Sequence, residues 1–435
     1  MSTTFDQVTS EHPLVLDDTI LHENDLTEQA KSRFSYHGDI LRGFESYRQS
    51  ILRNECLTHA SRHAVLSGLV EIHTKCKRVL NYVAEHSELL DCSLPALGPL
   101  FIIGLPRTGT TLLHNLLACD PDCRTPLFTD MCLEIVPPIS RLDLVEQKKR
   151  MDASQLSMQR DTSFATIRSQ ITAAHPFFPI DEDYHILRQA SFLPLFMMIT
   201  SDHESEHGAW LLDETKKDYA YDYHEVFLRM LNSVDAPRSH WLLKSPMHCL
   251  KLDTLLQHYP NAGLIMTHRH LDEVLPSFCS LAWTLASLYL DKENAASQNK
   301  VTTHSLQFID KAIECIMQFR TRQNCSLDQS KKNVFDVDYN DLMEQPINTV
   351  HRIYDHFGLR WSEEFEAAMD AWLRDNPQGK QGRHIYNLTE CGLTPEDIKT
   401  RYADYINLFH CSPPADTVSA SHDQFSSDNE PVEQA

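Results

Sequence analysis

Residues 99–113, PLFIIGLPRTGTTLL, contain the stretch that decides the fold. The apolar run 100–103 is typical of a strand that is buried on both faces of a parallel sheet. Gly104 and Gly109 bracket the loop that follows, and leucines then recur at helical spacing from Leu112 onward. A strand, a glycine-bounded loop and a helix form a phosphate cradle, because the loop amides and the positive end of the helix dipole point at one spot.

The loop differs from the common nucleotide-binding loop G-x-x-x-x-G-K-[ST] at one position. Thr110 follows the second glycine, where that loop carries lysine, and the cation Arg107 lies inside the loop instead. A nucleoside triphosphatase without this lysine lacks its contact with the β- and γ-phosphates. The alternative to a phosphate site is an ordinary strand–helix turn. We predict a phosphate-binding loop that comprises Arg107, Thr108, Gly109, Thr110 and Thr111.

The composition is that of an acidic globular chain. Its 435 residues include 39 Lys+Arg against 61 Asp+Glu, which gives a formal net charge of -22. Such a chain repels nucleic acid, so we expect no nucleic-acid partner, and a few clustered cations would focus their field at one pocket. The 12 cysteines form no C-x-x-C pair, which favours a reduced compartment. Because the start is not leader-like and no apolar run is long enough to cross a bilayer, we expect a cytoplasmic protein without a membrane span.

Composition and periodicity divide the chain into four parts. Residues 1–30 are polar, and residues 31–94 carry helical stripes that predict an N-terminal helical region packed on the main domain. Residues 95–411 form the predicted α/β domain. Residues 412–435 are rich in Ser, Pro and acids, contain no Lys or Arg, and are predicted to be a disordered acidic tail.

Three further apolar runs, at 240–243, 264–267 and 334–337, are predicted strands, and helical patterns separate them. Strands that alternate with helices predict an α/β fold with a central parallel sheet flanked by helices. Lys244 ends the first of these strands, and Arg269 follows the second. Ligands of open α/β sheets bind at these carboxyl ends, so both cations are candidate site residues.

Local signals predict where several helices begin and end. Ser245 is a typical N-cap, and Pro246 is a typical first helical residue. Another helix is predicted to begin near Asp272 and to carry Ser277. Gly358 is predicted to end the helix that follows the last strand.

Residues 203–207 read HESEH and match the zinc-peptidase pattern H-E-x-x-H. In those enzymes the two histidines lie on one turn of a helix. Here the stretch is polar throughout and Gly208 follows it, so we interpret it as an exposed loop and predict no metal site.

These motifs together resemble the sulfotransferases that use 3′-phosphoadenosine 5′-phosphosulfate (PAPS), in their broad bacterial and animal branch. Residues 105–111 look like the loop that binds the 5′-phosphosulfate, and Arg269 with Ser277, eight residues later, resembles the 3′-phosphate site. Residues 241–246 resemble the segment with the strand-end lysine, and residues 382–393 are similar to the C-terminal loop of this branch. The resemblance covers nearly the whole chain.

The resemblance implies a P-loop-like sulfotransferase fold and transfer of a sulfuryl group from PAPS to a hydroxyl or amine. The acceptor would be a small molecule, a lipid or a carbohydrate. Arg107 and the loop amides would hold the phosphosulfate, and Arg269 with Ser277 would hold the 3′-phosphate through charge-assisted hydrogen bonds. Lys380 and Arg383 would close over the 3′-phosphate as a lid. No metal is required, since protein cations take its role.

The resemblance also implies catalytic residues. Lys244 would neutralise charge on the bridging oxygen as the sulfuryl group leaves. The general base is His175, His248 or Glu182. We rank His175 first, because its position looks like a shared histidine of this branch, and His248 second, because it lies in the first helical turn after Lys244. The cytosolic branch has its catalytic histidine two residues after the lysine, where Pro246 stands here.

Two other functions fit parts of the sequence. A P-loop kinase or nucleoside triphosphatase would use the same strand–loop–helix unit, but the lysine after Gly109 is absent. A nucleotide-binding scaffold whose chemistry has lapsed would keep the donor site without transferring a group. Binding of adenosine 3′,5′-bisphosphate in preference to ATP would distinguish a sulfotransferase from a kinase or nucleoside triphosphatase. Transfer to an acceptor in a screen would distinguish it from the scaffold.

Overall fold

The computed structural model describes residues 19–159, 179–199, 206–213, 217–291, 293–325, 333–377 and 388–409. Among the predicted site residues, His175, Lys380 and Arg383 lie outside these ranges. The predicted acidic tail at 412–435 and most of the H-E-x-x-H stretch also lie outside them.

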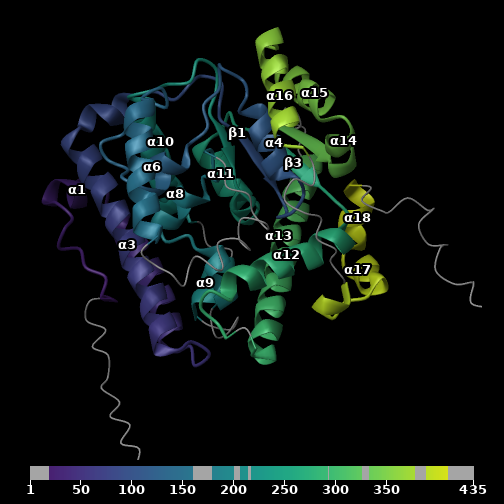
Figure 1. Cartoon of the computed structure of the whole chain (residues 1–435), viewed down its shortest axis with the longest axis horizontal. Helices are drawn as coiled ribbons and strands as arrows, with labels where there is room; N and C mark the ends of the chain where they lie inside the picture. The colour runs from purple at the N-terminus through teal and green to yellow at the C-terminus, as the bar shows by residue number, and fades with distance from the viewer. Residues whose placement is uncertain are drawn as a thin grey trace, which may run out of the picture.

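A parallel four-stranded sheet lies at the centre of the described chain (Figure 1), with the strand order β2-β1-β3-β4. Its strands are β1 (Leu100–Gly104), β2 (Leu242–Lys244), β3 (Gly263–His268) and β4 (Val334–Asp338). Ile102 of β1 is in register with Lys244 on one side and with Ile265 on the other. The predicted α/β fold with a central parallel sheet is therefore confirmed. The second strand begins two residues later than its apolar run, at Leu242 instead of His240.

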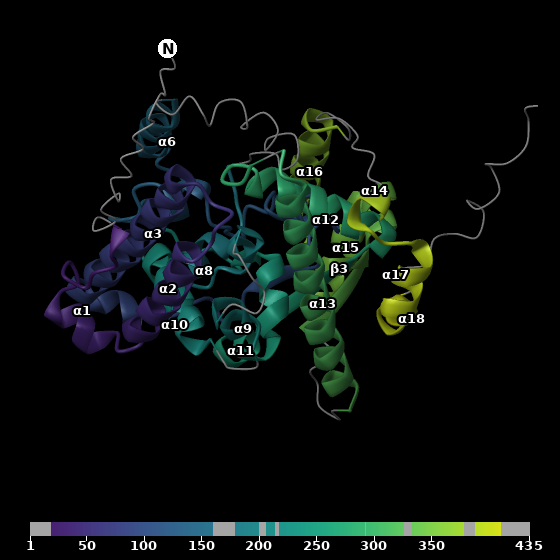
Figure 2. The same ribbon diagram turned by 90° about the horizontal axis from the view of Figure 1, so that it is seen from below.

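The N-terminal helices form a layer on one side of the sheet (Figures 1 and 2). The longest of them, α3, packs against two helices of the next segment, α8 (Tyr184–Gln189) and α10 (Asp218–Asn232). The layer consists of α1 (Glu28–Arg33), α2 (His37–Leu52), α3 (His59–Glu85) and the short η2 (Ser87–Asp91). The domain boundaries at residues 30 and 94 remain predictions.

The remaining helices lie between and after the strands. Between β1 and β2, besides α8 and α10, are α4 (Thr110–Leu117), α5 (Phe128–Cys132), α6 (Leu144–Gln159), η3 (Pro194–Ile199) and α9 (Glu206–Leu212). Between β2 and β4 are η4 (Pro246–Lys251), α11 (Leu252–His258), α12 (Leu271–Ala286) and α13 (Ala295–Cys325). After β4 follow α14 (Tyr339–Glu344), α15 (Pro346–Phe357), α16 (Glu363–Asp375), η6 (Leu388–Cys391), α17 (Pro395–Arg401) and α18 (Ala403–Phe409). Among these helices and the earlier ones, none within the described residues combines the length and apolar character needed to cross a bilayer.

Side chains of β1 alternate between two buried clusters. Phe101 and Ile103 belong to a large cluster that includes residues of α2, α3, α10, α12 and α13. Leu100 and Ile102 belong to a second cluster, with residues of α4, α15 and α16. Both faces of the sheet are therefore covered, which explains why the strand reads as an uninterrupted apolar run.

The predicted helix signals are confirmed in three helices. Ser245 caps η4, since its hydroxyl accepts a hydrogen bond from the Met247 amide at 3.2 Å, and Pro246 is the first residue of that helix. Ser277 lies inside α12. Gly358 ends α15 in the left-handed conformation, with φ 65°.

The carboxyl end of β1 approaches β3 closely at Gly104. This residue has φ 145°, and a Cβ atom placed on it would lie 2.5 Å from Thr267 Oγ1 and 2.7 Å from the Thr267 carbonyl oxygen. The backbone conformation and the contact both require glycine. The absence of a side chain therefore lets the loop after β1 settle onto the end of β3.

We predict that Gly104→Ala lowers the free energy of unfolding by about 2 kcal/mol or more, because it adds both a clash and backbone strain. Chemical denaturation measures this change. Gly68→Ala is the matched control, since Gly68 lies inside α3 with no atom within 4 Å of its added Cβ. That control should stabilise the protein by roughly 0.5–1 kcal/mol. Equal unfolding midpoints for the two variants would contradict the close approach.

Candidate active site

The loop between β1 and α4 has the conformation of an anion cradle. Arg107 and Gly109 are both left-handed, with φ 71° and 85°. The Thr108 hydroxyl lies 2.6 Å from both the Leu105 carbonyl oxygen and Thr267 Oγ1, and these contacts hold the loop on β3. Gly109 is the N-cap of α4 and no side chain of the described residues caps that helix. The first-turn amides and the positive end of its dipole are therefore available for an anion.

The structure brings the two predicted arginine elements together. Arg107 Nε donates to Ser277 Oγ at 3.0 Å, and Arg269 Nη1 donates to the Arg107 carbonyl oxygen at 3.0 Å. The Arg269 guanidinium carbon also lies 4.0 Å from the ring centroid of Tyr339, and its Nε donates to Glu273 at 2.7 Å. These contacts join the β1–α4 loop, the end of β3 and the first turns of α12 into one cationic site.

Lys244 lies at the same end of the sheet. Its ammonium group forms an ion pair with Glu182 and lies 3.4 Å from Thr111 Oγ1 in the first turn of α4. The Lys244 side chain is 3% exposed, whereas that of Glu182 is 16% exposed. The carboxylate therefore occupies the more accessible side of the pair.

Behind this pair lies a buried network centred on Asp183. Its carboxylate oxygen Oδ2 accepts hydrogen bonds from Nε2 of His224 at 3.0 Å and Nε2 of His248 at 2.8 Å. Their Nδ1 atoms face the hydroxyls of Tyr259 at 2.7 Å and Tyr221 at 2.9 Å. Both ring nitrogens of His248 are thus occupied and its side chain is fully buried. The role of His248 as general base stays a prediction, and it would require the buried ring to give up one of these two partners.

The network fixes the acidic segment that carries Glu182. Burial acts to raise the pKa of Asp183, but the charges and hydrogen bonds of His248 and His224 outweigh it and hold this pKa well below its ordinary value. Asp183 therefore binds the start of η4 while its neighbour Glu182 binds Lys244 at the end of β2. Asp183 and His224 were not among the predicted site residues, since no local pattern links an acid to histidines 41 and 65 residues away.

The described structure is an α/β fold that brings the loop after β1 and three cations to the carboxyl ends of a parallel sheet, where the ligands of open α/β sheets bind. Comparison with known proteins then gives the family. The chain belongs to the sulfotransferase family, whose model matches residues 99–363, more than half of the sequence. It is therefore a transferase that moves a sulfuryl group. This result removes the kinase or nucleoside triphosphatase alternative.

Similar proteins support this placement. The omega-hydroxy-beta-dihydromenaquinone-9 sulfotransferase Stf3 of Mycobacterium bovis is 23% identical over 377 residues, which cover 82% of this chain and 89% of that protein. The crystal structure of sulfotransferase STF9 from Mycobacterium avium matches with a TM-score of 0.70 and 24% identity, over 94% of this chain and 99% of that one. Sulfotransferase STF1 from Mycobacterium tuberculosis matches with a TM-score of 0.63 and 23% identity, over 88% of this chain and 94% of that one. These structures confirm the predicted P-loop-like sulfotransferase fold.

His114 lies in α4 below the cradle and gives the site a pH-dependent stability. Its side chain is buried, and Nε2 lies 2.7 Å from Thr125 Oγ1. Burial, assisted by the nearby charge of Lys244, lowers the pKa of His114 to about 3. In the unfolded chain the same group has its ordinary pKa of about 6.5. Below that pH the unfolded state gains a proton that the folded state does not accept.

We predict that lowering the pH from 7 to 5 decreases the free energy of unfolding by about 2 kcal/mol through His114 alone. The stabilising contribution of its lowered pKa is present above pH 6.5 and is lost as the pH falls, because the unfolded chain binds a proton there. Denaturant unfolding at both pH values measures the loss. His114→Gln is the comparison variant, because it keeps a polar group opposite Thr125 but does not titrate. An equal pH slope in the two proteins would show that the folded and unfolded chains protonate His114 over the same pH range, and thus that folding does not lower its pKa.

Proposed function

We propose that this chain transfers the sulfuryl group of PAPS to a hydroxyl or amine of a small-molecule, lipid or carbohydrate acceptor. One observation carries the choice of donor, namely the 3.0 Å hydrogen bond from Arg269 Nη1 to the Arg107 carbonyl oxygen. It joins two cationic elements that come from the ends of different strands. A donor with two separate anionic groups on one adenosine suits such a pair.

The residues of the site fit this donor. The first-turn amides of α4, with the hydroxyls of Thr110 and Thr111, would hold the 5′-phosphosulfate, and the helix start is free of a side-chain cap among the described residues. Arg269 and the Ser277 hydroxyl would hold the 3′-phosphate. Ser277 currently accepts a hydrogen bond from Arg107, so its oxygen already faces the cationic site. Lys380 and Arg383 stay predictions for a lid over that phosphate.

When bound, PAPS supplies a sulfuryl group that leaves its bridging phosphate oxygen. Lys244 holds a positive charge beside Thr111, at the start of α4. We assign to it the stabilisation of the negative charge that develops on the leaving phosphate. Its burial strengthens this effect, because a charge acts more strongly where water is excluded.

Glu182 is the candidate general base that the geometry of the described residues supports. Its carboxylate contacts Lys244 and is partly exposed, so an acceptor hydroxyl has access to it. The bonds of Asp183 to two histidines hold the neighbouring backbone in place. His175 remains the alternative base predicted from the sequence.

The acceptor class is supported by one relative. Stf3 is named for a sulfotransferase reaction on a hydroxylated dihydromenaquinone, which is a lipid-like alcohol. We therefore favour a lipid-like alcohol over a carbohydrate or an amine. A screen of alcohols of increasing apolar length with labelled PAPS is the direct measurement. Donor binding without transfer to any acceptor would instead support the scaffold whose chemistry has lapsed.

We predict that Arg107→Ala and Arg269→Ala each weaken binding of adenosine 3′,5′-bisphosphate by about 10- to 150-fold, or ~1.5–3 kcal/mol, because each removes a charged hydrogen bond. Titration calorimetry measures the change. Arg322→Ala is the control, since Arg322 is 55% exposed and pairs with Asp253 on the surface. Wild-type affinity in either test variant would remove that arginine from the donor site.

A second pair of variants separates catalysis from binding. Lys244→Ala should lower kcat by at least about 10²-fold, because it removes stabilisation of the leaving group, while donor affinity changes less. Glu182→Gln should lower kcat about 10²- to 10⁴-fold and leave donor affinity intact, because it removes the base and keeps the size of the side chain. Steady-state kinetics and donor titration give both numbers. If His175→Ala reproduces the Glu182 result and Glu182→Gln remains active, the base is His175.

A further inference from the structure

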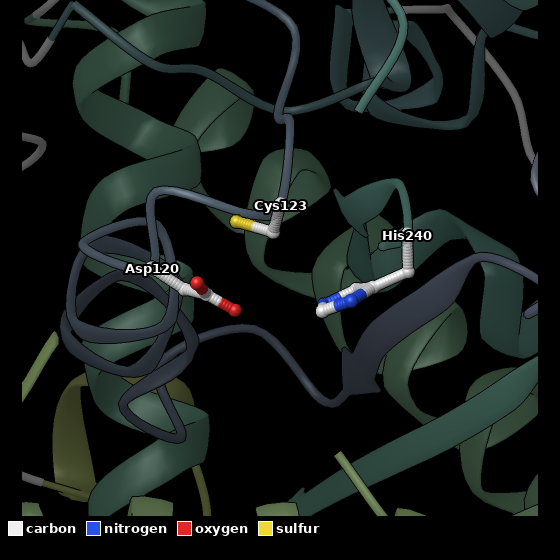
Figure 3. Close-up of side chains that lie close together, drawn as sticks. All are labelled: Asp120, Cys123 and His240. Atoms are coloured by element: carbon white, nitrogen blue, oxygen red, sulfur yellow. The ribbon is translucent and has the colours of Figure 1, made fainter. Parts of the chain in front are cut away.

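A second cluster of reactive side chains lies at the other end of β2. Asp120, Cys123 and His240 each offer one ligand atom, all within 4.8 Å of one another, and all three residues are buried (Figure 3). The first two follow the C-terminal end of α4, and His240 lies just before β2. Lys244 lies at the opposite, carboxyl end of this strand. The cluster is therefore separate from the proposed donor site.

His240 carries the most informative atom of the cluster. Its side chain is fully buried, Nδ1 lies 3.0 Å from Ser239 Oγ, and Nε2 has no hydrogen-bond partner within the described structure. Figure 3 shows the ring extending toward the carboxylate of Asp120, so its far edge, which carries Nε2, faces the cluster. A buried nitrogen without a partner destabilises the fold. When Nδ1–H donates to Ser239, Nε2 presents a bare lone pair to a carboxylate, an arrangement that a cation between them would stabilise.

The other two side chains are oriented by bonds that leave their ligand atoms usable. The Asp120 carboxylate accepts the Asp122 amide at 2.8 Å and the Tyr354 hydroxyl at 2.7 Å, and each oxygen keeps a second lone pair. The Cys123 thiol donates only a long bond, 3.5 Å, to the Leu117 carbonyl oxygen. Hydrogen bonds from outer groups orient first-shell ligands in this way in metal sites. The ligand spacing D-x-x-C also places two ligands on one turn, as paired zinc ligands are placed.

We propose that Asp120, Cys123 and His240 form a buried Zn²⁺ site. One thiolate, one imidazole and one carboxylate are ligands that zinc accepts, and the thiolate selects against Mg²⁺ and Ca²⁺. The divalent charge balances the carboxylate and the thiolate, so the buried site is neutral overall. Water completes the tetrahedral set. The site is independent of the sulfuryl transfer and of the H-E-x-x-H stretch at 203–207.

The ion would reinforce a junction that backbone bonds already form. The Ser239 amide donates to the Asp122 carbonyl oxygen at 2.8 Å, and the Arg124 amide donates to the His240 carbonyl oxygen at 3.1 Å. These bonds pair the segment after α4 with the segment before β2. Zinc bound to both segments would link them a second time through side chains, and its loss would loosen the start of β2.

The experiment uses the full chain, stripped with a chelator and then given one equivalent of Zn²⁺ before gel filtration and metal analysis. Wild type should retain about one ion per chain and unfold at a higher temperature than the stripped protein. Cys123→Ser and His240→Gln should lose the retained ion and this shift. Cys119→Ser is the matched control, because it removes a neighbouring thiol, which donates instead to the Asn115 carbonyl oxygen, and it should behave as wild type.

Absorption spectroscopy of the Co²⁺-substituted protein identifies the ligands directly and does not depend on the thermal stability of the variants. Wild type and Cys119→Ser should both show a thiolate-to-cobalt charge-transfer band and intense tetrahedral absorption at one equivalent, and Cys123→Ser should lack the band. Absence of the band in wild type, or its persistence in Cys123→Ser, overturns the site even if a variant folds poorly. Removing the metal with the chelator should leave the binding of adenosine 3′,5′-bisphosphate unchanged. A failure of the metal site is therefore distinguishable from a failure of the proposed donor site.

Discussion

The close approach of Gly104 to Thr267 is the constraint on which the rest of the site depends. Because β1 ends without a side chain at this point, the loop after it lies on the end of β3, where Thr108 and Thr267 share a 2.6 Å hydrogen bond. That position presents the carbonyl oxygen of Arg107 to Arg269, which follows β3 directly. The two cationic elements meet because two neighbouring parallel strands end together, not because any long loop brings them into contact.

Carboxylates control how the cations of this acidic chain are held. Lys244 is paired with Glu182, and Arg269 is paired with Glu273, so neither cation is buried without a counter-charge. Asp183 has a different task, since its fully buried carboxylate hydrogen-bonds to His224 and His248. The same acidic run therefore supplies one group near the accessible side of the site and one group that anchors the backbone behind it. The first is suited to exchange partners when substrates bind, and the second is not.

Local chemistry made much of the fold predictable. The apolar run before Gly104, the cap at Ser245 and the glycine at Gly358 act within a few residues, so the sequence alone contains their signal. The resemblance to a known family suggested Arg269 with Ser277 as a 3′-phosphate site, and this role stays a prediction; in the structure Ser277 accepts a hydrogen bond from Arg107, and Arg269 donates to the Arg107 carbonyl oxygen. His248 was ranked as a base because it follows Lys244 closely, but its role depends on partners from α10 and from the acidic segment that no sequence spacing indicates. The start of β2 was misplaced by two residues. His240 and Trp241 pair with the segment after α4, and the Trp241 carbonyl oxygen also accepts a hydrogen bond from the Leu100 amide of β1 at 2.8 Å.

One end of the sheet is shaped by charge. β4 is an outer strand of the sheet in the described chain, and such strands attract further strands from other molecules. Asp336 in this strand binds both Arg320 and His268, at 2.8 Å and 3.0 Å. Asp338 accepts the amides of Asn340 and Asp341, so the strand turns into α14 after only five residues. The border is therefore short, and its carboxylates are held by an ion pair to Arg320 and a hydrogen bond to His268. Short edge strands that carry charged side chains disfavour pairing with the strands of other molecules.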